Sequence, residues 1–299
     1  MDEIKAKLSG VFAPLVTPFE NDEILFDDLA ENVKRLNTTG LRGYLVLGTN
    51  GEFRALSVEE RFKVLETVLA TAALEKTIIA GTGTESTKET INLTLKAAEM
   101  GVHMATLLPP HFFAKRMDDI ALIGHVKAVA EVSPVPVMLY NNPSVSAGVT
   151  ASPNVIREIS GHPNVVGMKD SSKGNFEQYI QVAQRGFYVL AGSANFFLDL
   201  LEKGGSGGVL SLANVIPEAC VEVYQLYQKG DIHEAWEKQH QLITVNQMVS
   251  GTYGVAGVKT AMNMAGFKGG DPRRPLRPLT SEEKADLKER LSKTGFFAS

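Results

Sequence analysis

Short runs of β-branched and other apolar residues recur along the chain, and longer segments of helical periodicity separate them. The runs are Val11–Val16, Tyr44–Leu47, Thr77–Ala80, Met104–Leu108, Val135–Tyr140, Val165–Lys169, Tyr188–Ala191 and Gly208–Leu212. Between them apolar side chains return every three or four positions, for example at Ile91, Leu95 and Ala98, as on one face of a helix. Ser57 and Ser86 are each followed three residues later by a glutamate, which is the capping-box pattern of a helix start.

Strands that alternate with helices predict a parallel sheet with helical crossovers. Eight such repeats predict closure into a (β/α)8 TIM barrel, and an open doubly wound sheet is the structural alternative. After the eighth run only helical patterns follow: Pro217–Gln228, Ile232–Met248, Val255–Met264 and Ser281–Leu291. We therefore expect residues 1–225 to form the barrel that carries the active site. Residues 226–299 are expected to form a C-terminal helical appendage packed on it.

Composition narrows the class of protein further. The chain has 299 residues, 44% of them hydrophobic, which is enough to bury a large core. Its net charge of −4 gives no indication of nucleic-acid or membrane binding, and Arg273, Arg274 and Arg277 are expected to pair with acidic surface. The single cysteine, Cys220, is expected to be a small buried residue. No apolar stretch approaches the ~18 residues of a membrane span, so a cytoplasmic protein is the expectation.

Lys169 closes the sixth run, Val165–Lys169, and is followed by Asp170 and Ser171. Reactive side chains of such barrels lie at the carboxyl ends of the strands, so its ammonium is expected at the barrel mouth. Desolvation favours the neutral amine, which is the nucleophile that forms an imine with a carbonyl. The structural alternatives are a lysine that extends along an apolar surface toward water, or an ion-pair partner of Asp170.

Two further strand ends carry polar groups. Tyr140 ends the fifth run and can donate or accept a proton close to the lysine, although a packed core tyrosine is the alternative. The second run leads into Gly48-Thr49-Asn50-Gly51-Glu52. Its glycines allow a tight turn with exposed N–H groups that would hold a carboxylate or phosphate oxygen. An ordinary strand–helix turn is the alternative for this segment.

These three strand ends, in this order, resemble the dihydrodipicolinate synthase / N-acetylneuraminate lyase family of pyruvate-dependent class I aldolases. The resemblance extends roughly from Leu8 to Phe296. Its motifs are Gly48-Thr-Asn-Gly-Glu52, Ala80-Gly-Thr-Gly83, Val137-Met-Leu-Tyr-Asn141 with Pro143, Val166-Gly-Met-Lys-Asp-Ser171, Ala191-Gly-Ser193, and Gly207-Gly-Val-Leu-Ser211 with Ala213-Asn214. Within the family the chain looks most similar to the 4-hydroxy-2-oxoglutarate aldolases, which cleave their substrate to pyruvate and glyoxylate.

The resemblance implies roles for individual residues. Lys169 forms the imine, and Tyr140 shuttles protons. Thr49 and Asn50 hold the substrate carboxylate, with Thr49 also relaying a proton to Tyr140, and the backbone carbonyl of Leu210 orients this network. The other substrate-binding residues that it implies are Gly48, Ser171, Gly192 and Ser193. It also implies a small-molecule 2-oxo acid as substrate, no cofactor or metal, and a homo-oligomer, expected to be a tetramer.

Two departures from the family pattern bear on function. The family usually has a tyrosine in the loop after the fourth strand, where it relays protons in a neighbouring subunit, but here Phe112 and Phe113 occupy the aromatic positions. A phenyl ring cannot carry a proton, and His111 is one possible substitute. The lysine-pathway synthase has an arginine at the position of Val145 to bind a substrate carboxylate. Aspartate semialdehyde is therefore a poor substrate candidate.

Several readings stay open at this stage. His233 and His240 would share a helix face, but without a third ligand at metal spacing they do not indicate a zinc site. Besides 4-hydroxy-2-oxoglutarate cleavage, the same imine could serve dihydrodipicolinate synthesis, or a dehydratase, decarboxylase or aldolase acting on a sugar-derived 2-oxo acid. An alternative of another class is a protein that binds a 2-oxo acid without turning it over, as the missing tyrosine would allow.

Overall fold

The computed structural model describes residues 3–172 and 174–297. Eight strands follow one another in a closed barrel, in the order β1-β4-β5-β6-β7-β8-β9-β10 and back to β1. Their bounds are β1 Gly10–Pro14, β4 Gly43–Val46, β5 Thr77–Gly81, β6 Met104–Leu107, β7 Val137–Asn141, β8 Val165–Asp170, β9 Tyr188–Ala191 and β10 Gly207–Val209. The predicted TIM barrel is confirmed, and each of the eight predicted runs contains or overlaps one strand.

The chain forms two compact units. Unit 1 comprises the described part of residues 1–9 together with Thr77–Gly192 and Asp199–Gly208, and unit 2 comprises Gly10–Lys76, Ser193–Leu198 and the described residues from Val209 onward. The predicted division into 1–225 and 226–299 stays a prediction, and its outermost positions, residues 1–2 and 298–299, lie outside the described residues.

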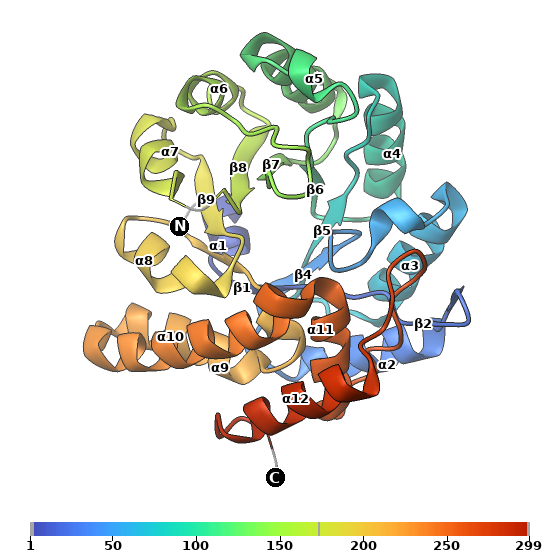
Figure 1. Ribbon diagram of the computed structural model, residues 1–299. Coiled ribbons are helices and arrows are strands. Elements are labelled where there is room, and N and C mark those ends of the chain that lie inside the picture. Colours follow the sequence, from blue (N-terminus) through green and yellow to red (C-terminus); the bar gives the residue numbers. More distant parts are fainter. Residues whose placement is uncertain (1–2, 173, 298–299) are drawn as a thin grey trace. The chain divides into compact units, whose positions relative to one another are not determined.

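In unit 1 the helices alternate with the strands, and α4 to α7 lie on the outer side of β5 to β8 (Figure 1). Their bounds are α4 Thr87–Glu99, α5 Asp119–Val132, α6 Pro153–Ile159 and α7 Phe176–Val182, with α1 Glu3–Leu8 at the start and the 3-10 helix η2 Ala114–Arg116 before α5. Strands β7 and β8 pair in parallel, with Tyr140 opposite Lys169 and Asn141 opposite Asp170. This register places the two predicted reactive side chains on neighbouring strands.

The start of α4 differs in one bond from its predicted capping box. The Ser86 hydroxyl accepts from the Glu89 N–H as predicted, but the Ser86 N–H donates to the Thr84 hydroxyl at 3.3 Å. The Thr84 hydroxyl thus accepts from the Ser86 N–H, as the Glu89 side chain was predicted to do. At Ser57 both bonds of the box are present.

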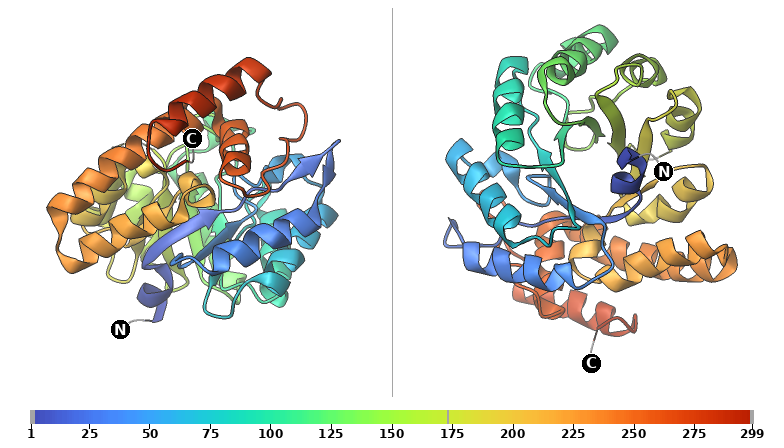
Figure 2. Two further views of the ribbon diagram at one scale, coloured as in Figure 1. Left: turned by 90° about the horizontal axis from the view of Figure 1, so that it is seen from below. Right: turned by 180° about the vertical axis from the view of Figure 1, so that it is seen from behind.

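Unit 2 begins with β1 and a short antiparallel hairpin, β2 Phe19–Glu20 and β3 Glu23–Ile24, which the hydrophobic pattern does not predict. Its further elements are α2 Phe26–Asn37, η1 Phe53–Ala55, α3 Val58–Thr71, η3 Ala194–Phe196, η4 Ser211–Asn214, α9 Pro217–Lys229, α10 Ile232–Asn246, the π-helix η5 Gln247–Gly251, α11 Thr252–Met264 and α12 Ser281–Ser292. Helix α8 Phe197–Glu202 begins in unit 2 and ends in unit 1. Helices α9 and α10 lie side by side (Figure 2).

The predictions for the basic loop and the cysteine are confirmed. Arg273 binds both carboxylate oxygens of Glu60, while Arg274 pairs with Asp22 and Arg277 with Glu283. Cys220 is fully buried in α9. In the described part of the chain no helix is both long and apolar enough to cross a membrane.

Candidate active site

Lys169 and Tyr140 form the centre of the candidate site in unit 1. Both lie at the carboxyl ends of their strands, and their exposed fractions are only 5% and 4%. The Lys169 Nζ lies 4.1 Å from the centroid of the Tyr140 ring. The Asn142 amide donates to the Tyr140 hydroxyl oxygen at 2.9 Å. The Lys169 amine and the Tyr140 phenol are close together and almost fully shielded from solvent. They therefore provide a nucleophile and a proton carrier for carbonyl chemistry.

Asp170 is not the partner of Lys169. Successive side chains of a strand point to opposite faces, and the Asp170 Oδ1 accepts from the Asn141 amide at 2.8 Å and from the Ser172 N–H at 3.1 Å. Burial raises the pKa of the Asp170 carboxyl despite these bonds. The acid therefore ties β8 to β7 and to the turn that follows, and leaves Lys169 available for chemistry.

Ser171 and Gly192 lie against each other at the ends of β8 and β9. The Ser171 hydroxyl is buried without a hydrogen-bond partner among the described residues. The Gly192 N–H donates to the Asp170 carbonyl at 2.6 Å. A Cβ at Gly192 would lie 1.9 Å from the Ser171 Oγ and 2.6 Å from the Asp170 carbonyl oxygen, so only glycine fits here.

Replacing Gly192 with alanine is expected to lower the free energy of unfolding by about 1–3 kcal/mol, because the added methyl overlaps backbone as well as the Ser171 side chain. Gly124→Ala is the matched control, since that glycine lies within α5 with nothing within 4 Å of its missing Cβ. The control is expected to be stabilising by roughly 0.5–1 kcal/mol. Urea unfolding of both variants measures the difference, and equal stabilities would contradict the close approach.

The predicted carboxylate loop, Gly48 to Glu52, is described within unit 2. It begins after Leu47 and ends with Glu52, which have φ of 62° and 53°, values that cost energy for residues with a Cβ. The segment was predicted to expose N–H groups, but the Gly51 N–H donates to the Gly48 carbonyl, and the Thr17 hydroxyl donates to the Gly51 carbonyl at 2.8 Å. The segment is therefore a closed turn in which fewer N–H groups are free than the sequence suggests.

Asn50 of this loop and two further predicted site residues of unit 2, Leu210 and Ser193, have hydrogen-bond partners. The Asn50 amide donates to the Ser211 hydroxyl at 2.9 Å, which fixes its orientation. The Leu210 carbonyl accepts from the Ala213 N–H and keeps one lone pair for a further bond. Ser193 caps η3 by accepting from the Asn195 N–H, so this hydroxyl has a local structural role.

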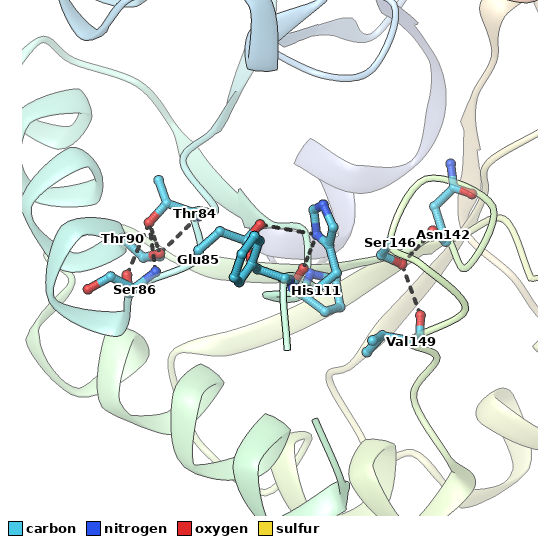
Figure 3. A network of polar contacts seen from close by, with 10 residues as sticks. Thr84, Glu85, Ser86, Thr90, His111, Asn142, Ser146 and Val149 are labelled. Atoms are coloured by element: carbon cyan, nitrogen blue, oxygen red, sulfur yellow. Dashed lines mark hydrogen bonds and ion pairs between the residues drawn. The ribbon is translucent and has the colours of Figure 1, made fainter. Parts of the chain in front are cut away.

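The loop that carries Phe112 and Phe113 is held by one carboxylate. The Glu85 Oε2 accepts from the N–H groups of His111 and Phe112 at 2.7 and 2.8 Å, and the His111 ring nitrogen lies 3.3 Å from the other oxygen (Figure 3). Phe112 and Phe113 are 77% and 68% exposed and meet edge to face. The His111 ring therefore contacts Glu85 within this loop. A side chain that replaced the tyrosine as proton relay would need to be free to move, so this contact argues against His111 as the substitute.

Sequence reasoning assigned no role to four residues that support the site. Asn142 binds the Tyr140 hydroxyl and Ser211 binds Asn50. In unit 2, Glu52, the last residue of the loop, forms a buried ion pair with Lys259. Lys259 had a usable signal, because it is the single charged residue in the helical window Val255–Met264.

The comparisons with known proteins agree over nearly the whole chain. Residues 7–294 match the dihydrodipicolinate synthetase family. A protein of Emericella nidulans named probable 4-hydroxy-2-oxoglutarate aldolase, mitochondrial, is 35% identical over 95% of this chain and 94% of its own length. A 4-hydroxy-tetrahydrodipicolinate synthase of Methanothrix thermoacetophila is 36% identical over 95% of this chain and 96% of its own.

Solved structures give the same picture. A crystal structure of a dihydrodipicolinate synthase has a TM-score of 0.90 at 30% identity, over 97% of this chain and all of that one. A prophage protein from E. coli K12, solved in complex with pyruvate, has a TM-score of 0.90 at 26% identity, over 96% of this chain and 99% of its own. The relatives therefore agree on the fold and differ in the reaction that their names state.

Proposed function

Because the chain belongs to the dihydrodipicolinate synthetase family and is a class I lyase of that family, we propose that it forms an imine between Lys169 and a 2-oxo acid. The substrate that we propose is 4-hydroxy-2-oxoglutarate, cleaved to pyruvate and glyoxylate. The observation that carries the proposal is the buried Lys169 amine, 4.1 Å from the centroid of the Tyr140 ring. The relative solved in complex with pyruvate supports the choice of a 2-oxo acid.

The proposed reaction uses Lys169 as nucleophile and Tyr140 as proton carrier. The amine attacks the C2 carbonyl, and loss of water from the carbinolamine leaves an iminium ion that serves as an electron sink. Tyr140 then removes the proton of the C4 hydroxyl, the C3–C4 bond breaks, and glyoxylate leaves. The enamine takes a proton at C3, and water hydrolyses the imine to release pyruvate. The Asn142 amide, bound to the Tyr140 oxygen, orients the phenol and stabilises the phenolate while it holds the charge.

The carboxylate of the 2-oxo acid is proposed to bind at Gly48, Thr49 and Asn50. Support comes from the fixed amide of Asn50 and from the position of the loop directly after β4, since residues at the carboxyl ends of barrel strands build the site in such folds. Thr49 also relays a proton to Tyr140, and the Leu210 carbonyl orients the network. Ser171 offers an unengaged hydroxyl to the rest of the substrate, and Gly192 and Ser193 are the further residues that we propose for this part of the substrate.

The assembly is part of the proposal. A homotetramer of this chain in the cytoplasm fits the family and the exposed aromatic pair Phe112–Phe113, whose burial between subunits would remove apolar surface from water. Because neither ring carries a proton, the relay that the family usually routes through a tyrosine must end here at water or at another group, or proton transfer is slower. Light scattering that gives a monomer would contradict the assembly.

A second candidate is 4-hydroxy-tetrahydrodipicolinate synthesis, the activity named for the relative that is 36% identical. That reaction condenses pyruvate with aspartate semialdehyde, whose carboxylate needs a cationic partner. Val145, at the position expected to hold the arginine, is an exposed apolar residue. The missing bidentate partner favours the aldolase over the synthase.

Product analysis separates the candidates. The wild-type protein is expected to release glyoxylate from 4-hydroxy-2-oxoglutarate with kcat/KM about 100-fold above that for aspartate semialdehyde. Val145→Arg is expected to narrow this ratio, while Val145→Leu, which adds no charge, should leave it unchanged. Faster turnover of aspartate semialdehyde by the wild type would favour the synthase. Loss of water or CO2 from a sugar-derived 2-oxo acid would indicate a dehydratase or decarboxylase, and binding without turnover of any donor would indicate a sensor.

A further inference from the structure

A buried lysine lies beneath the proposed carboxylate loop in unit 2. Lys259 belongs to α11 and has an exposed fraction of 1%. Its ammonium forms an ion pair with the Glu52 carboxylate, with 2.5 Å between Nζ and Oε1, and donates to the backbone carbonyls of Thr17 and Asp271 at 2.7 Å each. The charge of Lys259 is therefore committed to Glu52, and two backbone carbonyls hold the ammonium in place.

Glu52 is the last residue of the loop and has left-handed backbone angles, φ 53° and ψ 34°. Its side chain is almost fully buried, and its second oxygen accepts from the Arg273 N–H at 2.8 Å. A non-glycine residue keeps such a conformation only where surrounding contacts over-determine it. The bonds to Lys259 and Arg273 are the contacts that do so here.

We propose that the Lys259–Glu52 ion pair positions the carboxylate loop, holding Gly48 to Glu52 in the shape that receives the 2-oxo acid. The inference rests on the proposed function, since it assigns the pair an effect on substrate binding. Lys259 acts through Glu52 and touches no reacting atom, so it is a positioning residue. Its loss is expected to raise KM for the 2-oxo acid while kcat changes less, because Lys169 and Tyr140 remain in place.

The pair also makes binding depend on pH. Burial lowers the pKa of Lys259 to about 8, against the opposing effect of Glu52 and of Asp271, which raise it. Arg273 is a further charged group nearby, and its guanidinium lies over the same Phe19 ring as the Lys259 ammonium. Below this pKa the amine is charged and the pair is intact. Above it the amine is neutral, the Glu52 carboxylate loses its counter-charge, and KM is expected to rise.

A neutral isostere at Glu52 removes the ion pair at every pH. In Glu52→Gln no carboxylate remains to lose its counter-charge when Lys259 is deprotonated. KM is therefore expected to be raised already at neutral pH and to show no further rise at alkaline pH. A purely structural role for Glu52 would change stability and leave the wild-type dependence of KM on pH.

The test measures kcat and KM for the 2-oxo acid from about pH 6 to about pH 10, a range that spans the pKa of Lys259. Lys259→Met is expected to raise KM about tenfold at neutral pH and to abolish the rise at alkaline pH. Lys76→Met is the matched control, because Lys76 is another buried lysine, bound to the carbonyls of Thr39 and Leu41 and outside the loop. It is expected to lose stability and to keep the wild-type KM profile.

The kinetic profile of Glu52→Gln decides whether the ion pair positions the loop. A KM that is raised at neutral pH and does not rise further at alkaline pH in Glu52→Gln supports the inference, and the wild-type KM profile in this variant overturns it. If Lys259→Met does not fold, the isosteric Glu52→Gln still gives this readout. Borohydride trapping of the wild type with pyruvate separates the two proposals. A wild type that traps pyruvate while Glu52→Gln keeps the wild-type profile overturns only the positioning role, and a wild type that traps nothing overturns both.

Discussion

Replacing Lys169 with methionine is expected to lower kcat/KM by at least about 10⁴-fold, because the imine that serves as electron sink can no longer form. Methionine is unbranched and similar in length, so the packing beside Tyr140 should survive. The free energy of unfolding is expected to stay the same or to rise, since a buried amine is replaced by an apolar group. Steady-state kinetics together with urea unfolding measures both quantities.

Lys127→Met is the control for this variant. Lys127 lies on α5, is partly exposed and pairs with Glu158, so its loss is expected to change neither kinetics nor adduct formation. A Lys169→Met protein that is folded and retains activity within about tenfold of wild type would contradict the imine mechanism.

Replacing Tyr140 with phenylalanine is expected to lower kcat by about 10²–10⁴-fold, the usual contribution of a positioned acid–base group. The ring that contacts Lys169 remains, while the hydroxyl bound by Asn142 is lost. Imine formation with pyruvate should therefore become slower but still be detectable after borohydride reduction. Comparing the rate of carbon–carbon cleavage with the rate of adduct formation separates the two steps.

Tyr179→Phe provides the matched control within unit 1. The Tyr179 hydroxyl is also buried, donates to the Ala151 carbonyl at 2.7 Å and accepts from the Asn141 amide. Its removal is expected to cost about 0.5–1.5 kcal/mol of stability and to leave kcat close to the wild-type value. Equal effects of the two substitutions on kcat would mean that the Tyr140 hydroxyl is structural.

The strands could be predicted because each is a short apolar run between well-marked helices. In this barrel the strands are buried almost throughout, as in Val165–Asp170, where all six positions are buried. Continuous burial produces a continuous apolar run, which is easy to recognise. The hairpin Phe19–Ile24 has only two residues in each strand, too few to show any alternation.

The burial of helix faces was harder to predict. Ile91, Leu95 and Ala98 indicated the helix α4 correctly, yet its fully buried face consists of Thr90, Leu93, Thr94 and Ala97. Thr94 is accommodated because its hydroxyl bonds to Thr82 and to the Thr90 carbonyl inside the packed layer. A hydrogen-bonded threonine can replace an apolar residue in the interior, and hydrophobicity alone does not identify such a position.

The residues of the candidate site also differ in how well the sequence predicts them. Lys169 and Tyr140 stand at strand ends, where the barrel pattern places chemistry, so their neighbourhood could be predicted. Two of the supporting contacts could not, because their partners are remote in sequence: Glu52 pairs with Lys259, and Asn50 binds Ser211. Lys259 stands out as a charged residue in its helix, but its partner depends on the tertiary path of the chain, which no local pattern contains.

Borohydride reduction in the presence of pyruvate, followed by mass mapping of peptides, tests whether Lys169 forms the imine. We expect a reduced pyruvyl adduct on the peptide that contains Lys169, no adduct in Lys169→Met, and an unchanged amount in Lys127→Met. Folded wild-type protein that binds pyruvate but gives no adduct, or an adduct on a different lysine, would contradict the assignment of Lys169 as the imine-forming residue.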